Sequence, residues 1–219
     1  IKLAIESSKI FCIGVAGPIA SGKTIFAELL SQEIKKLKSN KIVKVVPLDY
    51  LLIERKFREK SLENILNSKI HFEHEAELHM DFHRIKDISQ TIKDIKLGIN
   101  KEKRLIIKNL YSRENKGKCT SKLDIHFHQN LIIIFEGHYT IRPTLFPVID
   151  KNFILLAHKE TLINRKVERS SNYRNTENVK KYFEYIDEPS YLSNYSRFAN
   201  ESSIIIDNTE FSNPKISNL

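Results

Sequence analysis

Five short, largely apolar runs recur along the chain, and stretches with helical spacing separate them. Apolar runs without regular polar alternation are typical of strands that a parallel sheet buries on both faces. The five runs are Ile10–Val15, Ile42–Val46, Leu131–Phe135, Phe153–Leu156 and Ile204–Ile206. Strands that alternate with helices predict an α/β fold built on a five-stranded parallel sheet with flanking helices.

Two of the intervening stretches have the spacing of amphipathic helices. The first covers residues 24–37, and its apolar positions are Phe26, Leu29, Leu30, Ile34 and Leu37. The second ends before Gly98, and its apolar positions are Ile85, Ile88, Ile92 and Ile95.

The interval between the second and third runs, residues 47–130, is too long for a plain crossover. Besides the second helix it contains an extended stretch at 103–111 and a polar, loop-like stretch at 114–121. An insertion at about 50–125 would cover the carboxyl end of the sheet, where ligands bind in open α/β folds. We therefore expect a substrate-covering insertion there, and a frayed tail after Asn208.

The composition fits one globular domain over residues 1–219, with 41% hydrophobic and 29% charged residues. The apolar runs are far shorter than the roughly 20 residues that a membrane-spanning helix needs, so we expect no membrane segment. The net charge of +9 comes from scattered lysines and arginines. Because no RNA-binding signature accompanies them, we expect no nucleic-acid partner.

Cysteine usage and the first residue add two expectations. Cys12 and Cys119 are too few for a disulfide framework, which favours a reducing, cytoplasmic location. The chain begins at Ile1 rather than at Met, so we expect a trimmed chain or part of a longer one. A homo-oligomer stays open.

A phosphate-binding motif follows the first run. The segment matches G-x-x-x-x-G-K-[ST], and its residues are Gly17, Pro18, Ile19, Ala20, Ser21, Gly22, Lys23 and Thr24. Its glycines let backbone N–H groups surround phosphate oxygens at a helix N-terminus. Lys23 would bridge the terminal phosphates, and the Thr24 hydroxyl would bind Mg²⁺. The alternative, an ordinary glycine turn, does not explain why a strand precedes the motif and a helix follows it.

Two acids follow predicted strands. Asp49 comes after the second run and Glu136 after the third. Because the carboxyl ends of parallel strands meet at one edge of the sheet, both acids are candidates for binding magnesium or accepting a proton. The alternative is that each only caps a following helix.

Several segments, in order, match the motifs of one family. Residues 21–24 have its Ser-Gly-Lys form, Leu48-Asp49-Tyr50 parallels Asp-x-Phe-Tyr, and Phe135-Glu136-Gly137 parallels its apolar-strand Glu-Gly. From about Phe11 to about Asp207 the chain resembles the uridine kinase and phosphoribulokinase family of P-loop kinases. The resemblance implies a three-layer P-loop NTPase-type fold with ATP and Mg²⁺ as cofactors. It also implies Asp49 as base and magnesium neighbour, and Glu136 as magnesium ligand.

The resemblance extends to a lid at about 160–178. There Arg165, Arg169 and Arg174 match the family's lid arginines, whereas Ser170 and Asn175 replace its Asp and Gly. Arg165 and Arg169 share one helix face at i and i+4, and a mobile guanidinium stabilises a transferring phosphoryl group. Taken without the resemblance, the same segment reads as a solvated helix face.

The acceptor side departs further from the family. Glu73-His74 resembles the family's Asp-His acceptor contact, and Tyr111 resembles the Tyr of its Pro-x-Tyr-Asp segment. The resemblance implies that Glu73, His74, Tyr111, Asp49 and Arg169 contact the acceptor. A buried, interfacial Tyr111 is equally compatible with the sequence.

We therefore expect an ATP-dependent kinase of a small-molecule hydroxyl, with a pyrimidine nucleoside (uridine or cytidine) as the best candidate acceptor. The alternatives are a sugar phosphate, glycerate, pantothenate or nicotinamide riboside. A degenerate nucleotide-binding regulatory module also stays open. His79 and His83 have a metal-ligand spacing, but they lack cysteine partners nearby, so we do not expect a zinc site.

Overall fold

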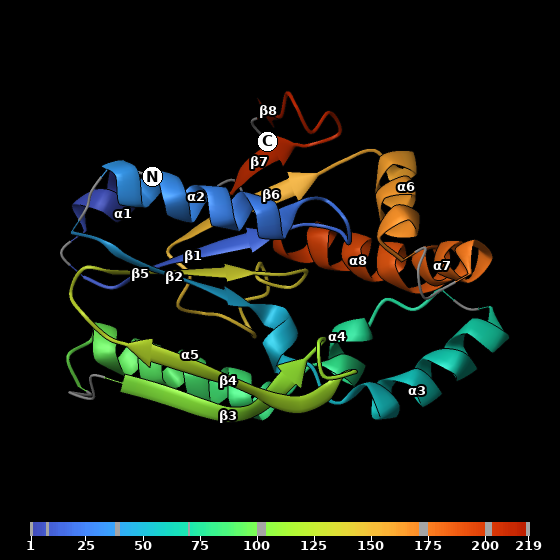
Figure 1. Ribbon diagram of the computed structural model, residues 1–219, viewed down its shortest axis with the longest axis horizontal. Coiled ribbons are helices and arrows are strands. Elements are labelled where there is room, and N and C mark those ends of the chain that lie inside the picture. Colours follow the sequence, from blue (N-terminus) through green and yellow to red (C-terminus); the bar gives the residue numbers. More distant parts are fainter. Residues whose placement is uncertain are drawn as a thin grey trace.

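A six-stranded sheet forms the centre of the molecule in the computed structural model (Figure 1), in the order β2-β5-β1-β6-β7-β8. The structure describes residues 2–7, 9–37, 40–69, 71–99, 104–170, 175–199 and 203–217. The strands are β1 (Phe11–Ala16), β2 (Ile42–Pro47), β5 (Leu131–Glu136), β6 (Lys151–Leu156), β7 (Ile204–Asp207) and β8 (Lys215–Ser217). The first five of these are mutually parallel, which confirms the five predicted strands.

The sixth strand, β8, was not expected, and a frayed tail is wrong for these residues. It pairs antiparallel with β7, with Ile216 opposite Ile206. Ile216 is its only apolar residue and is 75% exposed. Backbone hydrogen bonds to the edge of β7 therefore keep β8 in the sheet. The sequence of β8 has no hydrophobic pattern from which a strand could be predicted.

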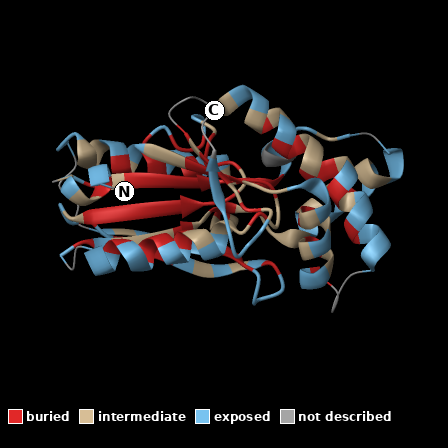
Figure 2. Ribbon diagram, turned by 90° about the horizontal axis from the view of Figure 1, so that it is seen from above, coloured by how far each residue is buried: buried red, intermediate tan, exposed pale blue. Residues whose placement is uncertain are grey.

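Burial on both faces explains the continuous apolar runs. All six residues of β5 are buried, and five of the six in β1 are buried (Figure 2). The side chains of β5 point alternately to the two faces of the sheet, as the two-residue period of a strand requires. Ile132 and Ile134 belong to one hydrophobic cluster, and Ile133 and Phe135 to the other.

The first layer consists of α1 (Lys2–Glu6) and α2 (Lys23–Leu37). In α2, Leu30 and Ile34 pack on the sheet as the helical spacing predicts, together with Ala27, whereas Leu29 and Leu37 are exposed. The second layer contains α5 (Phe82–Lys96), whose Ile85, Ile88 and Ile92 are fully buried. The predicted second helix and its end before Gly98 are thus confirmed.

The segment between β2 and β5 is the insertion. It comprises η1 (Leu48–Leu51), α3 (Arg55–Ser68), α4 (Glu75–His79), α5, β3 (Arg104–Ser112) and β4 (Lys118–His126). The extended stretch predicted at 103–111 corresponds to β3. The loop predicted at 114–121 is wrong from Lys118 onward, because polar residues there pair with β3 as a hairpin. Pairing with a partner strand therefore outweighs the polar composition.

A second helical group lies beyond the carboxyl ends of the strands (Figure 1). It consists of α6 (Lys159–Ser170), α7 (Thr176–Tyr182), the π-helix η2 (Phe183–Asp187) and α8 (Glu188–Phe198). Pro189 has no N–H to donate to the carbonyl of Tyr185. That carbonyl instead accepts a hydrogen bond of 2.8 Å from the Phe72 N–H, which joins the insertion to η2.

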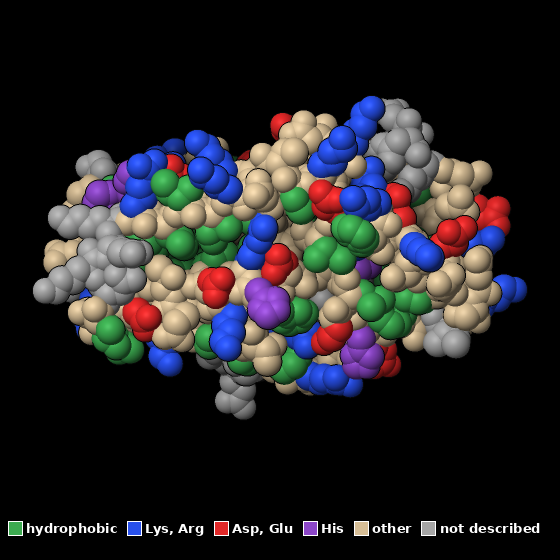
Figure 3. All heavy atoms as spheres, turned by 90° about the horizontal axis from the view of Figure 1, so that it is seen from below, with side chains coloured by type: hydrophobic (Ala, Val, Ile, Leu, Met, Phe, Trp, Pro, Cys, Tyr) green, Lys and Arg blue, Asp and Glu red, His purple; other side chains and the backbone are tan. Residues whose placement is uncertain are grey.

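The exterior bears on two of the expectations. Within the described residues, no helix is long and apolar enough to cross a membrane. Figure 3 shows the face below α5 and the β3–β4 hairpin, where acidic side chains lie among the basic ones. The absence of a nucleic-acid partner and the cytoplasmic location stay predictions.

Candidate active site

The order of the strands brings three segments together that are distant in sequence. β5 lies between β2 and β1, and Glu136 is level with Pro47 on one side and Val15 on the other. The P-loop, Glu136 and Asp49 therefore follow three neighbouring strand ends. Gly137 makes the close approach possible, because its φ is +157° and a Cβ there would lie 2.6 Å from the Leu48 Cβ.

The P-loop has the backbone that the motif predicts. It connects β1 to the first turn of α2. Gly17 has a φ of +147°, and a Cβ at this position would lie 2.3 Å from the Leu155 carbonyl oxygen. Ala20 also has a positive φ, of 62°, which is uncommon for a residue with a side chain and is typical of strained, ligand-holding turns. The positive φ angles and the close approach at Gly17 therefore fix the shape of the loop.

Lys23 lies among the charged residues of the site. Its Nζ donates a hydrogen bond of 2.7 Å to the Pro18 carbonyl. Burial lowers the pKa of Lys23 to about 8, while the charges of Glu136 and Asp49 act to raise it and that of Arg169 acts to lower it further. A partly buried ammonium group that donates a hydrogen bond to a carbonyl is suited to receive a phosphate anion.

Thr24 and Glu136 form a pair of oxygen ligands. The Thr24 hydroxyl donates to Glu136 Oε1 over 3.3 Å, and Glu136 is only 7% exposed. Burial raises the pKa of Glu136, and the nearby Lys23 charge opposes this effect. A cation would stabilise such a buried carboxylate, and magnesium typically takes one or two protein oxygens beside substrate phosphates. Thr24 and Glu136 therefore fit a Mg²⁺ site, and Asp49 follows the adjacent strand end.

Asp49 forms an ion pair that the sequence did not indicate. Its carboxylate contacts the Arg113 guanidinium, and both side chains are partly exposed. Arg113 comes from the turn between β3 and β4, and its charge, like that of Arg169, acts on Lys23. An arginine in a polar loop carries no pattern in the sequence, so only the packing of the hairpin beside η1 identifies it.

The three predicted lid arginines have different environments. Arg165 and Arg169 lie on α6, as predicted, whereas Arg174 lies outside the described residues. Arg165 Nη2 donates to the carbonyls of Asn208 and Thr209 over 2.9 and 3.1 Å. The Asn208 side-chain amide donates a hydrogen bond of 2.8 Å to the Ser21 carbonyl of the P-loop. Arg165 therefore connects the lid, through the loop after β7, to the phosphate site.

A buried ion pair joins α6 to η2. Lys166 of α6 contacts Asp187 of η2, and each side chain is 4% exposed. The Lys166 ammonium also lies 4.4 Å from the ring centroid of Tyr182. Removing one member of such a buried pair is strongly destabilising. The lysine looks like an ordinary surface residue in the sequence, so its role could not be predicted.

The predicted acceptor residues Glu73 and Tyr111 have different partners. The Glu73 carboxylate lies 3.9 Å from the Arg197 guanidinium of α8. The preceding residue, Phe72, donates its backbone N–H to η2. Tyr111 is 3% exposed, and the Arg58 guanidinium lies 4.8 Å from its ring centroid. The buried reading of Tyr111 therefore matches the structure, while contact of Glu73 and His74 with an acceptor stays a prediction.

The two histidines with metal-ligand spacing lie on different helices. His79 is the last residue of α4, and His83 lies in the first turn of α5. The i, i+4 arrangement of a single helix is therefore absent at this described pair.

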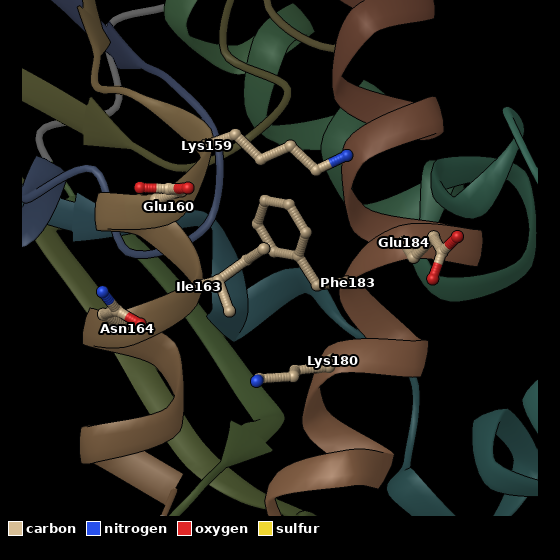
Figure 4. A pocket seen from close by; sticks show the side chains of 7 residues that line it. All are labelled: Lys159, Glu160, Ile163, Asn164, Lys180, Phe183 and Glu184. Carbon is tan, nitrogen blue, oxygen red and sulfur yellow. The ribbon is translucent and has the colours of Figure 1, made fainter.

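A cavity of about 500 Å³ lies between α6 and the helix formed by α7 and η2 (Figure 4). Ile163 and Phe183 provide its apolar surface, with Lys159 and Lys180 at its border. None of the P-loop residues lines this cavity, so it is separate from the phosphate site.

No family model matches the sequence, and no curated protein matches it. Solved structures with the same fold include a possible uridine kinase from Bacillus stearothermophilus, with a TM-score of 0.60, 19% identity and coverage of 90% of this chain and 87% of that one. D-glycerate 3-kinase from Cryptococcus neoformans var. grubii matches with a TM-score of 0.63, 11% identity and coverage of 95% and 90%. YFH7 from Saccharomyces cerevisiae matches with a TM-score of 0.66, 9% identity and coverage of 94% and 95%. The chain thus has the fold of these proteins, two of which are described as kinases of small hydroxyl compounds.

Proposed function

We propose that this protein is an ATP-dependent kinase that transfers the γ-phosphoryl group to a hydroxyl of a small molecule. One observation carries the proposal: the P-loop Lys23, the Thr24–Glu136 pair and Asp49 meet at three adjacent strand ends. A P-loop alone indicates only nucleotide binding. An additional carboxylate beside it supplies what transfer to a hydroxyl requires.

The triphosphate would lie in the P-loop, with backbone N–H groups and Lys23 on its oxygens. Thr24 and Glu136 would hold Mg²⁺, which supplies charge neutralisation on the phosphates when bound. The Lys23 ammonium would exchange its hydrogen bond to the Pro18 carbonyl for stronger, charge-assisted bonds to phosphate.

Asp49 would accept the proton of the acceptor hydroxyl. The hydroxyl oxygen then forms a bond to the γ-phosphorus, while the bond from this phosphorus to the β–γ bridging oxygen breaks and ADP leaves. Arg169, whose charge already acts on Lys23, would stabilise the charge on the transferring group. The same role for Arg165 and Arg174 rests on the sequence.

The best candidate acceptor from the sequence is a pyrimidine nucleoside. The resemblance to uridine kinases supports it, and one structure of the same fold is described as a possible uridine kinase. Another is described as D-glycerate 3-kinase, so the fold accommodates more than one kind of acceptor.

The test is ADP formation by the purified protein with Mg²⁺ and ATP across a panel of acceptors. Stimulation by uridine or cytidine alone would identify a nucleoside kinase. Stimulation by another hydroxyl compound would support the kinase with a different acceptor. ATP binding without stimulation by any acceptor would favour the regulatory module and refute the proposal.

A further inference from the structure

The Arg113 guanidinium occupies the side of the site that the insertion builds. It forms an ion pair with Asp49, the residue proposed as base. Lys23 and Thr24 begin α2 and Glu136 ends β5, whereas Arg113 comes from the β3–β4 hairpin. The phosphate side and the hairpin therefore approach Asp49 from different parts of the fold.

The turn that carries Arg113 is held by hydrogen bonds at both of its ends. The Gly117 N–H donates a hydrogen bond of 2.9 Å to the Ser112 carbonyl, and the Asn115 N–H donates one of 3.3 Å to the Ser112 hydroxyl. The Arg55 N–H donates a hydrogen bond of 3.0 Å to the Gly117 carbonyl, and this bond connects the turn to the start of α3. Arg113 is thus presented from a fixed turn rather than from a free loop.

A bulge in β3 directs this end of the hairpin. Asn109 has a φ of +57°, and the pairing register with β4 shifts between Ile107 and Leu110. Such bulges bend a strand and re-aim the side chains beyond them. The Asn109 carbonyl also accepts a hydrogen bond from Arg84 of α5, so the bend is anchored to the second layer.

The charge balance at Asp49 changes when an acceptor binds. The charges of Arg113 and Arg169 both act on Lys23, and the Asp49 carboxylate is the ion-pair partner of Arg113. A carboxylate that accepts the proton of a substrate hydroxyl must turn toward that hydroxyl and ends up neutral. The Arg113 guanidinium keeps its charge throughout, so an anionic group of the acceptor can replace the Asp49 carboxylate as its partner.

We propose that the acceptor carries its own anionic group, a carboxylate or a phosphate, and that Arg113 binds this group. This inference rests on the proposed kinase function, and it favours an anionic hydroxyl compound over the pyrimidine nucleoside that the sequence alone suggests. The planar guanidinium would exchange the Asp49 carboxylate for the acceptor anion, and this exchange frees Asp49 to face the hydroxyl. An uncharged nucleoside would offer Arg113 no such replacement.

A different role for Arg113 makes a different prediction. If Arg113 instead stabilises the transferring phosphoryl group, its loss should lower turnover equally for charged and uncharged acceptors. If it binds an anion of the acceptor, its loss should raise KM for charged acceptors only. Matched pairs of acceptors that differ by one anionic group separate the two roles.

The experiment compares the wild type with Arg113→Gln and Arg113→Lys on three pairs of acceptors and on uridine. The pairs are D-glycerate with glycerol, ribulose 5-phosphate with ribulose, and pantothenate with pantothenol. The matched control is Arg104→Gln, because Arg104 forms an arginine–aspartate pair with Asp124 on the same hairpin. ADP formation gives kcat and KM, and titration of the protein saturated with Mg²⁺ and a non-hydrolysable ATP analogue gives acceptor binding.

We expect the wild type to prefer the charged member of at least one pair by about 100-fold in kcat/KM. Arg113→Gln should remove most of this preference through KM, while Arg113→Lys keeps part of it and Arg104→Gln keeps all of it. The affinity for the ATP analogue should stay within about two-fold in every variant.

Three outcomes would overturn the inference. A preference for uridine or for the uncharged members would refute it and leave the kinase proposal intact. An equal loss of turnover on both members of a pair would assign Arg113 to the phosphoryl group. If no acceptor is phosphorylated, the kinase proposal fails, and the inference that rests on it fails as well.

Discussion

The two sides of the site differ in how they are built. The phosphate side consists of one continuous motif and an acid on the adjacent strand, and Glu136 is 7% exposed there. The acceptor side combines a short 3₁₀ turn, a hairpin turn and partly exposed charges, with Asp49 and Arg113 side chains 38% and 59% exposed. Backbone geometry and burial fix the positions of the residues on the first side. On the second side, ion pairs join side chains from distant segments of the chain.

This difference bears on what each side can recognise. A backbone cradle at a helix N-terminus binds any polyphosphate and changes little with the rest of the sequence. Exposed ion pairs are weak and can exchange partners, so the residues of the acceptor side can be rearranged on binding. Under the proposed function, phosphoryl transfer would depend on the buried side, and the choice of acceptor would depend on the exposed side.

The largest expected effect tests the phosphate side. Lys23→Ala should lower kcat/KM for ATP by roughly 1000-fold, because it removes a partly buried cation from both the bound triphosphate and the transition state. Steady-state kinetics with ATP and titration with a non-hydrolysable analogue should both show the loss. Lys36→Ala is the control, since Lys36 is an exposed residue of the same helix paired with Glu33. Normal activity of Lys23→Ala would remove the P-loop from the mechanism.

The next effect separates the two sides. Asp49→Asn should lower turnover by about 100-fold or more while leaving the affinity for ATP within a few-fold, because the amide cannot accept the proton. Asp124→Asn serves as control, because its carboxylate pairs with Arg104 on the hairpin. Unchanged turnover in Asp49→Asn would mean that another group takes the proton.

A pH profile sharpens the phosphate side. Lys23 has a pKa lowered to about 8 by burial, so it is charged below pH 8 and loses its charge as the pH rises above it. Binding of the ATP analogue should therefore be pH-independent near pH 7 and weaken by up to about ten-fold per unit above pH 8. Calorimetric titrations at pH 7, 8 and 9 measure the slope. In Lys23→Arg the guanidinium stays charged, so binding of the ATP analogue should no longer weaken above pH 8. The same pH dependence in the wild type and in Lys23→Arg would assign the effect to another group.

The smallest expected effect concerns Tyr111. Its ring is buried beneath Arg58, so Tyr111→Phe should change KM for the acceptor by no more than about two-fold. Kinetics with a phosphorylated acceptor measures this. A rise of ten-fold or more would return Tyr111 to the acceptor contacts and enlarge the acceptor side.

Much of the fold followed from local pattern. The apolar runs predicted all five parallel strands, because burial on both faces leaves few polar residues in them. The strand β8 and the start of β4 at Lys118 were missed, since pairing with a neighbouring strand holds both and their side chains are largely polar or exposed. The π-helix η2 likewise depends on Pro189 together with the distant Phe72 N–H.

The sequence by itself determined the phosphate side, because eight consecutive residues form the cradle and the strand and helix around them have clear patterns. It also placed Asp49 and Glu136 after strands. Only the tertiary structure decided that β5 lies between β1 and β2, which brings these acids to the P-loop. It also decided that Arg113 pairs with Asp49 and that Arg165 contacts the loop after β7. Such contacts join side chains that are far apart in the chain, and no local periodicity records which distant partner a charged side chain will meet.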